Sequence, residues 1–364
     1  MTTSIDGYER PDGTVGIRNH VLVVPSVICS QIVAERIADE LPYARATPHD
    51  HGCAQLGADN EQTARTLVGI GTNPNVAGVV VVGLGCEEVQ SDDVADSLAE
   101  RGAPVRELSI QDVGGTEACV RRGIELAREL WMQADTQERA ISLGDLTVGV
   151  VSSDLRESTR EVAAPLVGDA VDELLEAGAR VVVAGTERVL AHPDDARART
   201  TSDAAAQLDE LLSRHRSQPP RATRVGMRAA SLDFDDGTRE WGSSNVEEVI
   251  EYGSPSSLDS GLALLDAPSR FEEAATGLVA AGAGLIVHLT ADGIPAGHPT
   301  APVLKVSGER STVGALADDI DVDATAATAN DLCSSIRAVA DGRPCAVDEH
   351  GLTEFAITRV GPSM

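Results

Sequence analysis

Short aliphatic runs alternate with longer amphipathic stretches along most of the chain. The runs Val79–Val82 and Val181–Val183 are apolar at consecutive positions, which is typical of strands buried on both faces of a parallel sheet. Strands are predicted at Val21–Pro25, Val76–Leu84, Val105–Ser109, Leu146–Ser152, Arg180–Ala184, Leu262–Leu265 and Gly284–Thr290, and helices at Ser30–Leu41, Glu61–Ile70, Gly115–Gln137, Ser158–Glu176 and Ser202–Arg214. This alternation predicts an α/β fold of two Rossmann-like layered domains with mostly parallel sheets.

A polar stretch near the middle of the chain marks the predicted domain boundary. It runs from Gln137 to Gly144, and a new aliphatic run begins directly after it. We therefore predict an N-terminal α/β domain at residues 1–140 and a C-terminal α/β domain at residues 145–364. The helix-rich sequence after Leu316 is expected to pack back on the second sheet.

The chain is strongly acidic. It has 58 Asp and Glu against 29 Lys and Arg, a formal charge of −29, and Lys305 is its only lysine. The acids are scattered rather than gathered in one block, which favours a solvated, halophilic surface; the alternative is that the acid attracts a basic partner or a metal. Such a charge disfavours binding to nucleic acid or to anionic lipid.

The sequence also predicts where the protein resides. The N-terminal residues Met1–Arg10 contain no hydrophobic signal region, and no apolar run approaches the roughly 20 residues of a membrane span. We therefore expect a cytoplasmic protein whose six cysteines are thiols rather than a disulfide framework.

Residues with metal-binding side chains follow three of the predicted strands and segments. They are Cys29, His49, Cys53, Cys86 and Glu87, and ligands of α/β proteins bind at the carboxyl ends of parallel strands. These side chains suit a transition metal or an iron–sulfur unit. The alternative is that the cysteines are small buried hydrophobes, because the chain has no C-x-x-C motif.

Two arginines lie among turn-forming residues before the first strand. Arg10, Asp12, Arg18 and Asn19 are separated by glycines, and guanidinium groups bind carboxylates bidentately. This segment is either a clamp for an anionic substrate or a solvated surface turn.

Several motifs, in this order, resemble the altronate/galactarate dehydratase family, which includes the large subunit of (2R)-sulfolactate sulfo-lyase. They are Gly7-Tyr8-Glu9-Arg10-Pro11-Asp12-Gly13 continuing to Gly16-Ile17-Arg18-Asn19, Pro25-x-x-x-Cys29, His49-x-x-Gly52-Cys53-x-Gln55-x-Gly57, Asn73-Pro74-Asn75, Gly83-Leu84-Gly85-Cys86-Glu87, and Thr290-Ala291-Asp292-Gly293-Ile294-Pro295-x-Gly297 with Lys305. The resemblance spans nearly the whole chain.

The resemblance implies a lyase that eliminates water, or alternatively sulfite, from a sugar acid. It also implies a divalent metal. Fe²⁺ is the expected ion, and Mn²⁺, Mg²⁺ or an iron–sulfur cluster are the alternatives. On this basis we predict three sets of residues: catalytic His49, Lys305 and Glu87; substrate-binding Arg10, Arg18, Asn19, Gln55, Gly293 and Gly297; and metal-binding Cys29, Cys53 and Cys86.

Two departures from the family pattern affect the prediction. The small domain that family members carry before the Gly-Tyr-x-Arg segment is expected on a separate small subunit, in an oligomer. The residues Val151–Arg156 stand where the family has Glu-Cys-Gly-Gly-Ser-Asp, so the cysteine and glycines are gone. A non-catalytic or divergent relative, which binds a sugar acid or acts as an assembly partner, is therefore the alternative function.

Overall fold

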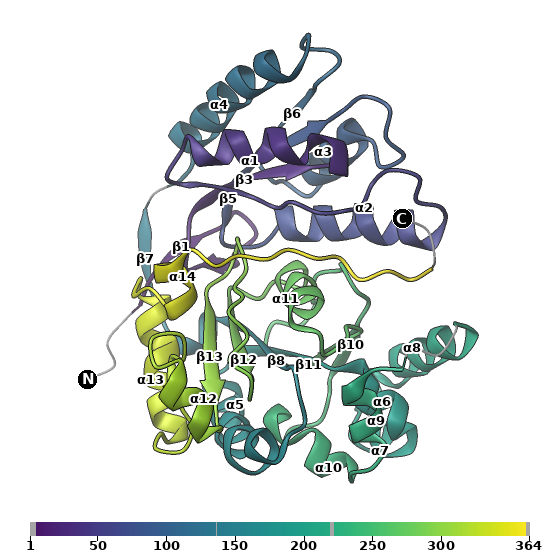
Figure 1. The fold of residues 1–364 in the computed structure, drawn as a ribbon, viewed down its shortest axis with the longest axis vertical. Helices are drawn as coiled ribbons and strands as arrows, with labels where there is room; N and C mark the ends of the chain where they lie inside the picture. Colours follow the sequence, from purple (N-terminus) through teal and green to yellow (C-terminus); the bar gives the residue numbers. More distant parts are fainter. Residues whose placement is uncertain (1–4, 136, 219–221, 362–364) are drawn as a thin grey trace.

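A computed structural model describes residues 5–135, 137–218 and 222–361 of the chain, and Figure 1 shows its two layered α/β units. The first unit is built on a four-stranded parallel sheet with strand order β4-β3-β5-β6. Helices α1 and α4 cover one face of this sheet, and α2 and α3 cover the other. The elements are β3 His20–Pro25, α1 Gln31–Asp39, β4 Ala44–Ala46, α2 Ala58–Gly71, β5 Val76–Gly83, α3 Ser91–Glu100, β6 Val105–Ser109 and α4 Thr116–Gln133.

The second unit is built on a seven-stranded parallel sheet with strand order β10-β11-β9-β8-β12-β13-β14. Its strands are β8 Thr147–Ser152, β9 Arg180–Ala184, β10 Glu248–Ile250, β11 Gly261–Leu265, β12 Leu285–Leu289, β13 Val303–Ser307 and β14 Val322–Asp323. Its helices are α5 Ala164–Glu176, α6 Thr186–Ala191, α7 Pro193–Ala198, α8 Ala205–Ser217, α9 Arg224–Ala229, α10 Phe234–Gly237, α11 Phe271–Ala280, α12 Arg310–Ala315, α13 Ala329–Ala340 and α14 Ala346–His350. The predicted α/β fold with parallel sheets is confirmed.

Valine runs form the centres of both sheets, as their pattern predicts. Residues Val79–Val82 in β5 and Val181–Val183 in β9 are fully buried, because helices cover both faces of each sheet. The core is therefore almost entirely aliphatic.

A small antiparallel sheet joins the start of the chain to the connection between the units. Strand β1 (Ile5–Glu9) pairs with β2 (Val15–Gly16) on one side and with β7 (Glu138–Ile141) on the other. Arg139 also forms an ion pair with Glu9, with 2.8 Å between nitrogen and oxygen. The predicted boundary stretch is thus partly strand; the domain limits at 140 and 145 stay a prediction.

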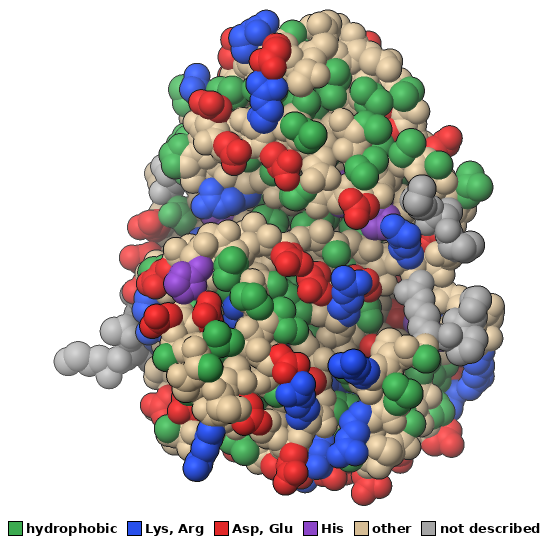
Figure 2. Space-filling model, viewed as in Figure 1, with side chains coloured by type: hydrophobic (Ala, Val, Ile, Leu, Met, Phe, Trp, Pro, Cys, Tyr) green, Lys and Arg blue, Asp and Glu red, His purple; other side chains and the backbone are tan. Residues whose placement is uncertain are grey.

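The two units pack through α2 and α11 and through the end of the chain. Residues 352–361, which we call the C-terminal strap, form no helix or strand and run along α2 in Figure 1. Within the described residues, no helix is long and apolar enough to span a membrane. Figure 2 shows acidic and basic side chains scattered over the visible face rather than gathered in one patch.

Candidate functional site

Glu87 holds together the loops at the carboxyl edge of the first sheet. Its carboxylate accepts hydrogen bonds from the Ser26 hydroxyl (2.8 Å) and from the backbone N–H groups of Leu84 (3.1 Å), Gly85 (2.6 Å) and Cys86 (2.8 Å). Burial raises the pKa of Glu87, but these hydrogen bonds outweigh it and leave the pKa below its ordinary value. The carboxylate is therefore ionised, and it is occupied by hydrogen bonds from its own loop and from Ser26.

His49 and His51 are fixed in the neighbouring loop. The backbone N–H of His51 donates to His49 Nδ1 (3.1 Å), so His49 Nε2 carries the proton and donates to the Pro25 carbonyl (2.7 Å). The Gln55 amide donates to His51 Nδ1 (2.8 Å), and His51 Nε2 donates to the Ile357 carbonyl of the C-terminal strap (3.0 Å). Burial lowers the pKa of His49 to about 4, so its ring is neutral at pH 7 and both its nitrogens are engaged.

The thiols of Cys29, Cys53 and Cys86 are exposed on three loops that touch one another. The Gly52 carbonyl accepts the backbone N–H of Glu88 (3.2 Å), which joins two of these loops. Across residues 5–135, 137–218 and 222–361, however, no group of three His, Cys, Asp or Glu side chains is placed to hold a metal ion. These residues do not fit a metal as they stand, and we derive no chemical step through one.

Arg10, Arg18 and Asn19 lie at the opposite, amino edge of the same sheet. Asn19 directly precedes β3, the Arg10 Nε–H donates to the Pro74 carbonyl (2.6 Å), and an Arg18 guanidinium N–H donates to the Val339 carbonyl (3.0 Å). Both guanidinium groups thus bind backbone carbonyls, that of Arg10 within the first unit and that of Arg18 on α13 of the second unit. The structure does not bring this segment together with the loops around Glu87.

The predicted residues of the second unit are separate again. Lys305 lies in the middle of β13, is fully buried, and its amine has no hydrogen-bond partner among the described residues; burial lowers its pKa. Gly293 has φ +65°, which suits glycine, and a Cβ on Gly297 would lie 2.5 Å from the Leu352 carbonyl oxygen. The two glycines are therefore required by the local backbone and packing.

The segment Asn73-Pro74-Asn75 joins the units. The side-chain amide oxygen of Asn75, Oδ1, accepts hydrogen bonds from the backbone N–H groups of Ile17 (2.9 Å) and Arg18 (3.1 Å). Its amide nitrogen donates to the carbonyls of Gly284 (2.8 Å) and Thr300 (3.1 Å) in the second unit. A fully buried amide with four partners explains this motif by interdomain packing.

A cavity of about 620 Å³ lies between the two units, where β9, β10 and β11 end. Helix α2 and the C-terminal strap form the wall from one side, and α6, α8 and α9 form it from the other. Apolar side chains such as Leu190 and Met227 line part of it. Its charged lining is balanced, with four arginines and four carboxylates: Arg65, Arg214, Arg216, Arg359, Glu61, Glu187, Glu251 and Asp266. We call this cavity the interdomain pocket.

A carboxylate–imidazole pair lies in the interdomain pocket. Asp266 directly follows β11, and its carboxylate accepts hydrogen bonds from His215 Nε2 (2.7 Å) and the Thr186 hydroxyl (3.1 Å) while pairing with Arg214 (3.0 Å). Burial raises the pKa of Asp266, but the hydrogen bonds and charges of His215 and Arg214 outweigh it and lower the pKa. Neither residue was predicted from the sequence as a site residue; the signal that the sequence did contain was an aspartate directly after a predicted strand.

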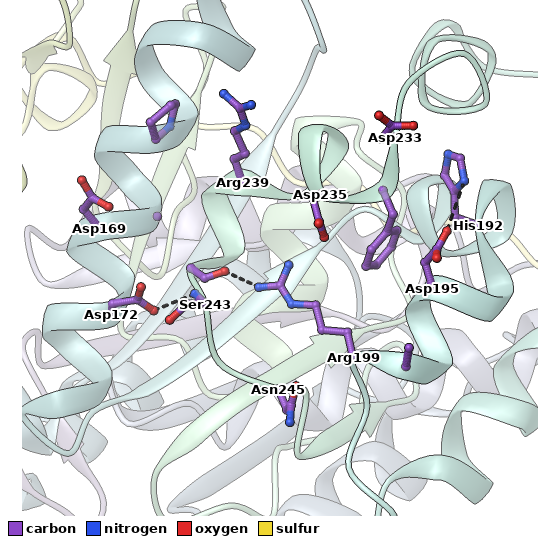
Figure 3. Close-up of a pocket in the computed structure, with 15 residues that line it drawn as sticks. Asp169, Asp172, His192, Asp195, Arg199, Asp233, Asp235, Arg239, Ser243 and Asn245 are labelled. Carbon is purple, nitrogen blue, oxygen red and sulfur yellow. Dashed lines mark hydrogen bonds and ion pairs between the residues drawn. The ribbon is translucent and has the colours of Figure 1, made fainter.

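A second hollow, of about 910 Å³, lies on the α5 face of the second unit (Figure 3). Two of its polar side chains are held by backbone: Asp172 accepts the Ser243 N–H (2.8 Å) and Arg199 donates to the Gly242 carbonyl. Its charged lining is mostly acidic: Asp169, Asp172, Asp195, Asp233 and Asp235 against Arg199 and Arg239. This hollow therefore repels an anionic ligand, unlike the interdomain pocket.

Comparison with known proteins identifies the family. The model described as "D-galactarate dehydratase/Altronate hydrolase, second domain" matches residues 7–135, and the one described as "D-galactarate/Altronate dehydratase, C-terminal" matches residues 237–363. The chain is 28% identical to the beta subunit of (2R)-sulfolactate sulfo-lyase from Chromohalobacter salexigens, with 97% of each chain covered.

Two further relatives are longer than this chain. It is 28% identical to an altronate dehydratase from Bacillus subtilis, over 83% of this chain and 65% of that one, and 26% identical to a galactarate dehydratase (L-threo-forming) from Escherichia coli, over 88% and 68%. The two domain models match in order, and between them only residues 136–236, the connection and the first part of the second unit, are unmatched. The protein therefore belongs to the D-galactarate/altronate dehydratase family.

Proposed function

We propose that the protein is a lyase that eliminates water, or in the alternative sulfite, from carbons 2 and 3 of a sugar acid bound in the interdomain pocket. One observation carries this proposal: the pocket is lined by residues from both matched family regions. Ala58, Glu61, Gln62 and Arg65 come from the region 7–135, and Glu251, Asp266 and Thr358 to Val360 come from the region 237–363. Its position beyond the carboxyl ends of parallel strands is also where α/β enzymes bind ligands.

The lining suits a hydroxylated carboxylate. The Arg65 Nε–H donates to the Tyr252 carbonyl (2.9 Å) and its guanidinium pairs with Glu251 (3.2 Å), so the side chain is held in place at the pocket wall. A positioned guanidinium with remaining N–H groups binds a substrate carboxylate, and the neighbouring acids accept from sugar hydroxyls. In a chain of net charge −29, a charge-balanced cavity is the favourable place for an anion.

The protein is further proposed to act as the large subunit of a complex with a small partner. The relative with coverage of 97% on both chains is itself named as a beta subunit. The divalent metal that the family resemblance implies stays a separate prediction. It is tested by measuring the iron and manganese content of protein purified without oxygen.

A coupled assay tests the proposal. The chain, alone and with a co-expressed small partner, is incubated with D-altronate, D-galactarate and (2R)-sulfolactate while 2-keto acid, pyruvate and sulfite are measured. We expect one of these substrates to be consumed. Binding of a sugar acid without turnover by the complex would instead support the non-catalytic alternative.

A further inference from the structure

The His215–Asp266 pair differs from the histidines of the family motifs in what its ring leaves available. Both nitrogens of His49 and of His51 are engaged by backbone or by Gln55. Among the described residues, the His215 ring is engaged only through Nε2, by Asp266 at 2.7 Å. Nδ1 is then the nitrogen that a pocket ligand can reach.

The pair is also rigidly held. The Asp266 side chain is 11% exposed and accepts hydrogen bonds from Thr186, Arg214 and His215. The His215 side chain is 28% exposed and lines the pocket. A buried carboxylate that accepts a hydrogen bond from one imidazole nitrogen fixes the orientation of the ring. This is the arrangement that a general base requires, a held ring with one free nitrogen facing a cavity.

We propose that His215, oriented by Asp266, is the base that removes the carbon-2 proton of the sugar acid in the interdomain pocket. This inference rests on the proposed lyase function and assigns its base to the second unit rather than to the first-sheet loops. His215 is the catalytic residue in this scheme, because it touches the substrate, and Asp266 is a positioning residue.

The step balances without any oxidant or reductant. His215 Nδ1 takes the proton from carbon 2, and the electron pair of that C–H bond becomes the double bond between carbons 2 and 3. The bond from carbon 3 to its hydroxyl oxygen breaks, and the departing hydroxide takes a proton to leave as water. The resulting enol gains a proton at carbon 3 and loses the proton of its carbon-2 hydroxyl to give the 2-keto acid, and His215 returns its proton to solvent.

Substitution of His215 tests the assignment, with a second histidine–aspartate pair as the matched control. His192 is 21% exposed and lies 3.8 Å from Asp195 in the acidic hollow, outside the interdomain pocket. His215→Ala should lower kcat about 10²–10⁴-fold, the usual contribution of a general base, and added imidazole should restore part of it. His192→Ala should leave kcat unchanged.

Asp266→Asn tests the positioning role. Loss of the carboxylate should lower kcat more than it changes KM, and it should shift the acidic limb of the pH–kcat profile, which a merely structural defect would not move. Unchanged kcat in His215→Ala, at wild-type folding by circular dichroism, would overturn the proposal.

A binding measurement separates failure of this inference from failure of the proposed function. Ring signals of His215, assigned by their absence in His215→Ala, are followed by NMR while D-galactarate or D-altronate is added. The inference expects the His215 signals to shift and the His192 signals to stay. A complex that turns over a sugar acid without any shift at His215 would overturn the inference alone, whereas a shift without turnover by any complex would overturn the lyase function.

Discussion

At the scale of single residues, the six cysteines divide into two sets that a thiol reagent should distinguish. Cys29, Cys53 and Cys86 are exposed, whereas the other three are buried and burial raises their pKa values to about 11 for Cys119 and about 12 for Cys333 and Cys345. Since the thiolate is the reactive form, native protein should show three fast thiols and unfolded protein six. If added Fe²⁺ slows the reaction of the three exposed thiols, they form a metal site only when the ion is bound. Six equally fast thiols in the native protein would contradict the fold.

Glu87 is predicted to matter for stability through its charge. Glu87→Gln should lower the free energy of unfolding at pH 7, because an amide cannot satisfy the N–H groups that the carboxylate accepts. The folded pKa of Glu87 lies below its unfolded value, so its contribution is present above the unfolded pKa and is lost as the pH falls through the folded pKa. The difference between wild type and variant should therefore shrink in acid. Exposed Glu88→Gln is the matched control, and an equal effect of both changes, measured by urea unfolding, would argue against this role.

The position of the polar motif residues could be predicted from the sequence, but their partners could not. Side chains that follow buried strands must lie at the carboxyl edge of a sheet, and Glu87 and His49 do so. Whether such a group is free or engaged depends on backbone N–H and carbonyl groups in other loops, such as Pro25 for His49. No pattern in the sequence encodes that contact. For the same reason, the sequence did not show that His215 and Asp266, 51 residues apart, would meet.

At the scale of elements, strands with a continuous aliphatic run and the longer amphipathic helices were predictable, and most short strands were not. The seven predicted strands correspond to β3, β5, β6, β8, β9, β11 and β12, because a continuous aliphatic run has few alternatives to burial in a sheet. Strands β1, β2, β4, β7, β10 and β14 have only two to five residues each, so their formation depends on pairing rather than on their own pattern. The buried strand β13 was also not predicted, because Lys305 interrupts its aliphatic run.

The C-terminal strap depends on a small number of contacts with α2. Asp59 Oδ1 accepts the backbone N–H groups of Val360 (2.6 Å) and Gly361 (2.8 Å), and Gln62 donates to the Thr358 carbonyl. Hydrogen bonds to a charged group contribute about 1.5–3 kcal/mol, so Asp59→Ala should speed amide exchange in residues 354–361 by at least about tenfold. Asp93→Ala, an exposed acid in the first turn of α3, controls for the loss of a helix N-terminal charge. Unchanged exchange, measured by mass spectrometry, would show that the strap is held elsewhere.

At the scale of the whole molecule, buried neutral histidines should make the fold sensitive to mild acid. Burial lowers the pKa of His49 to about 4 and the pKa values of His288 and His298 to about 3. The unfolded chain binds these protons near pH 6.5 and the folded chain does not, so stability falls as the pH drops below 6.5. Each group contributes up to about 1.4 kcal/mol per pH unit. A flat urea midpoint between pH 7 and pH 5 would contradict this.

The net charge of −29 predicts a dependence on salt. Acid–acid repulsion acts over a Debye length of about 30 Å at 0.01 M salt and about 3 Å at 1 M. We expect the melting temperature to rise between these conditions, with sucrose as the uncharged control. Equal melting temperatures in dilute buffer and in molar KCl would contradict the halophilic interpretation of the surface.

The antiparallel pairing of β1 with β7 bears on how a ligand enters. It ties four residues of the connection between the units into a sheet, from Ile5 opposite Ile141 to Tyr8 opposite Glu138. A connection held in this way keeps the two units in a fixed relative position, so the interdomain pocket is already formed before any ligand binds. Ligand entry then depends on movements of the strap and of the pocket side chains. The two units do not close around the ligand. Its radius of gyration in solution should be the same with and without a bound sugar acid.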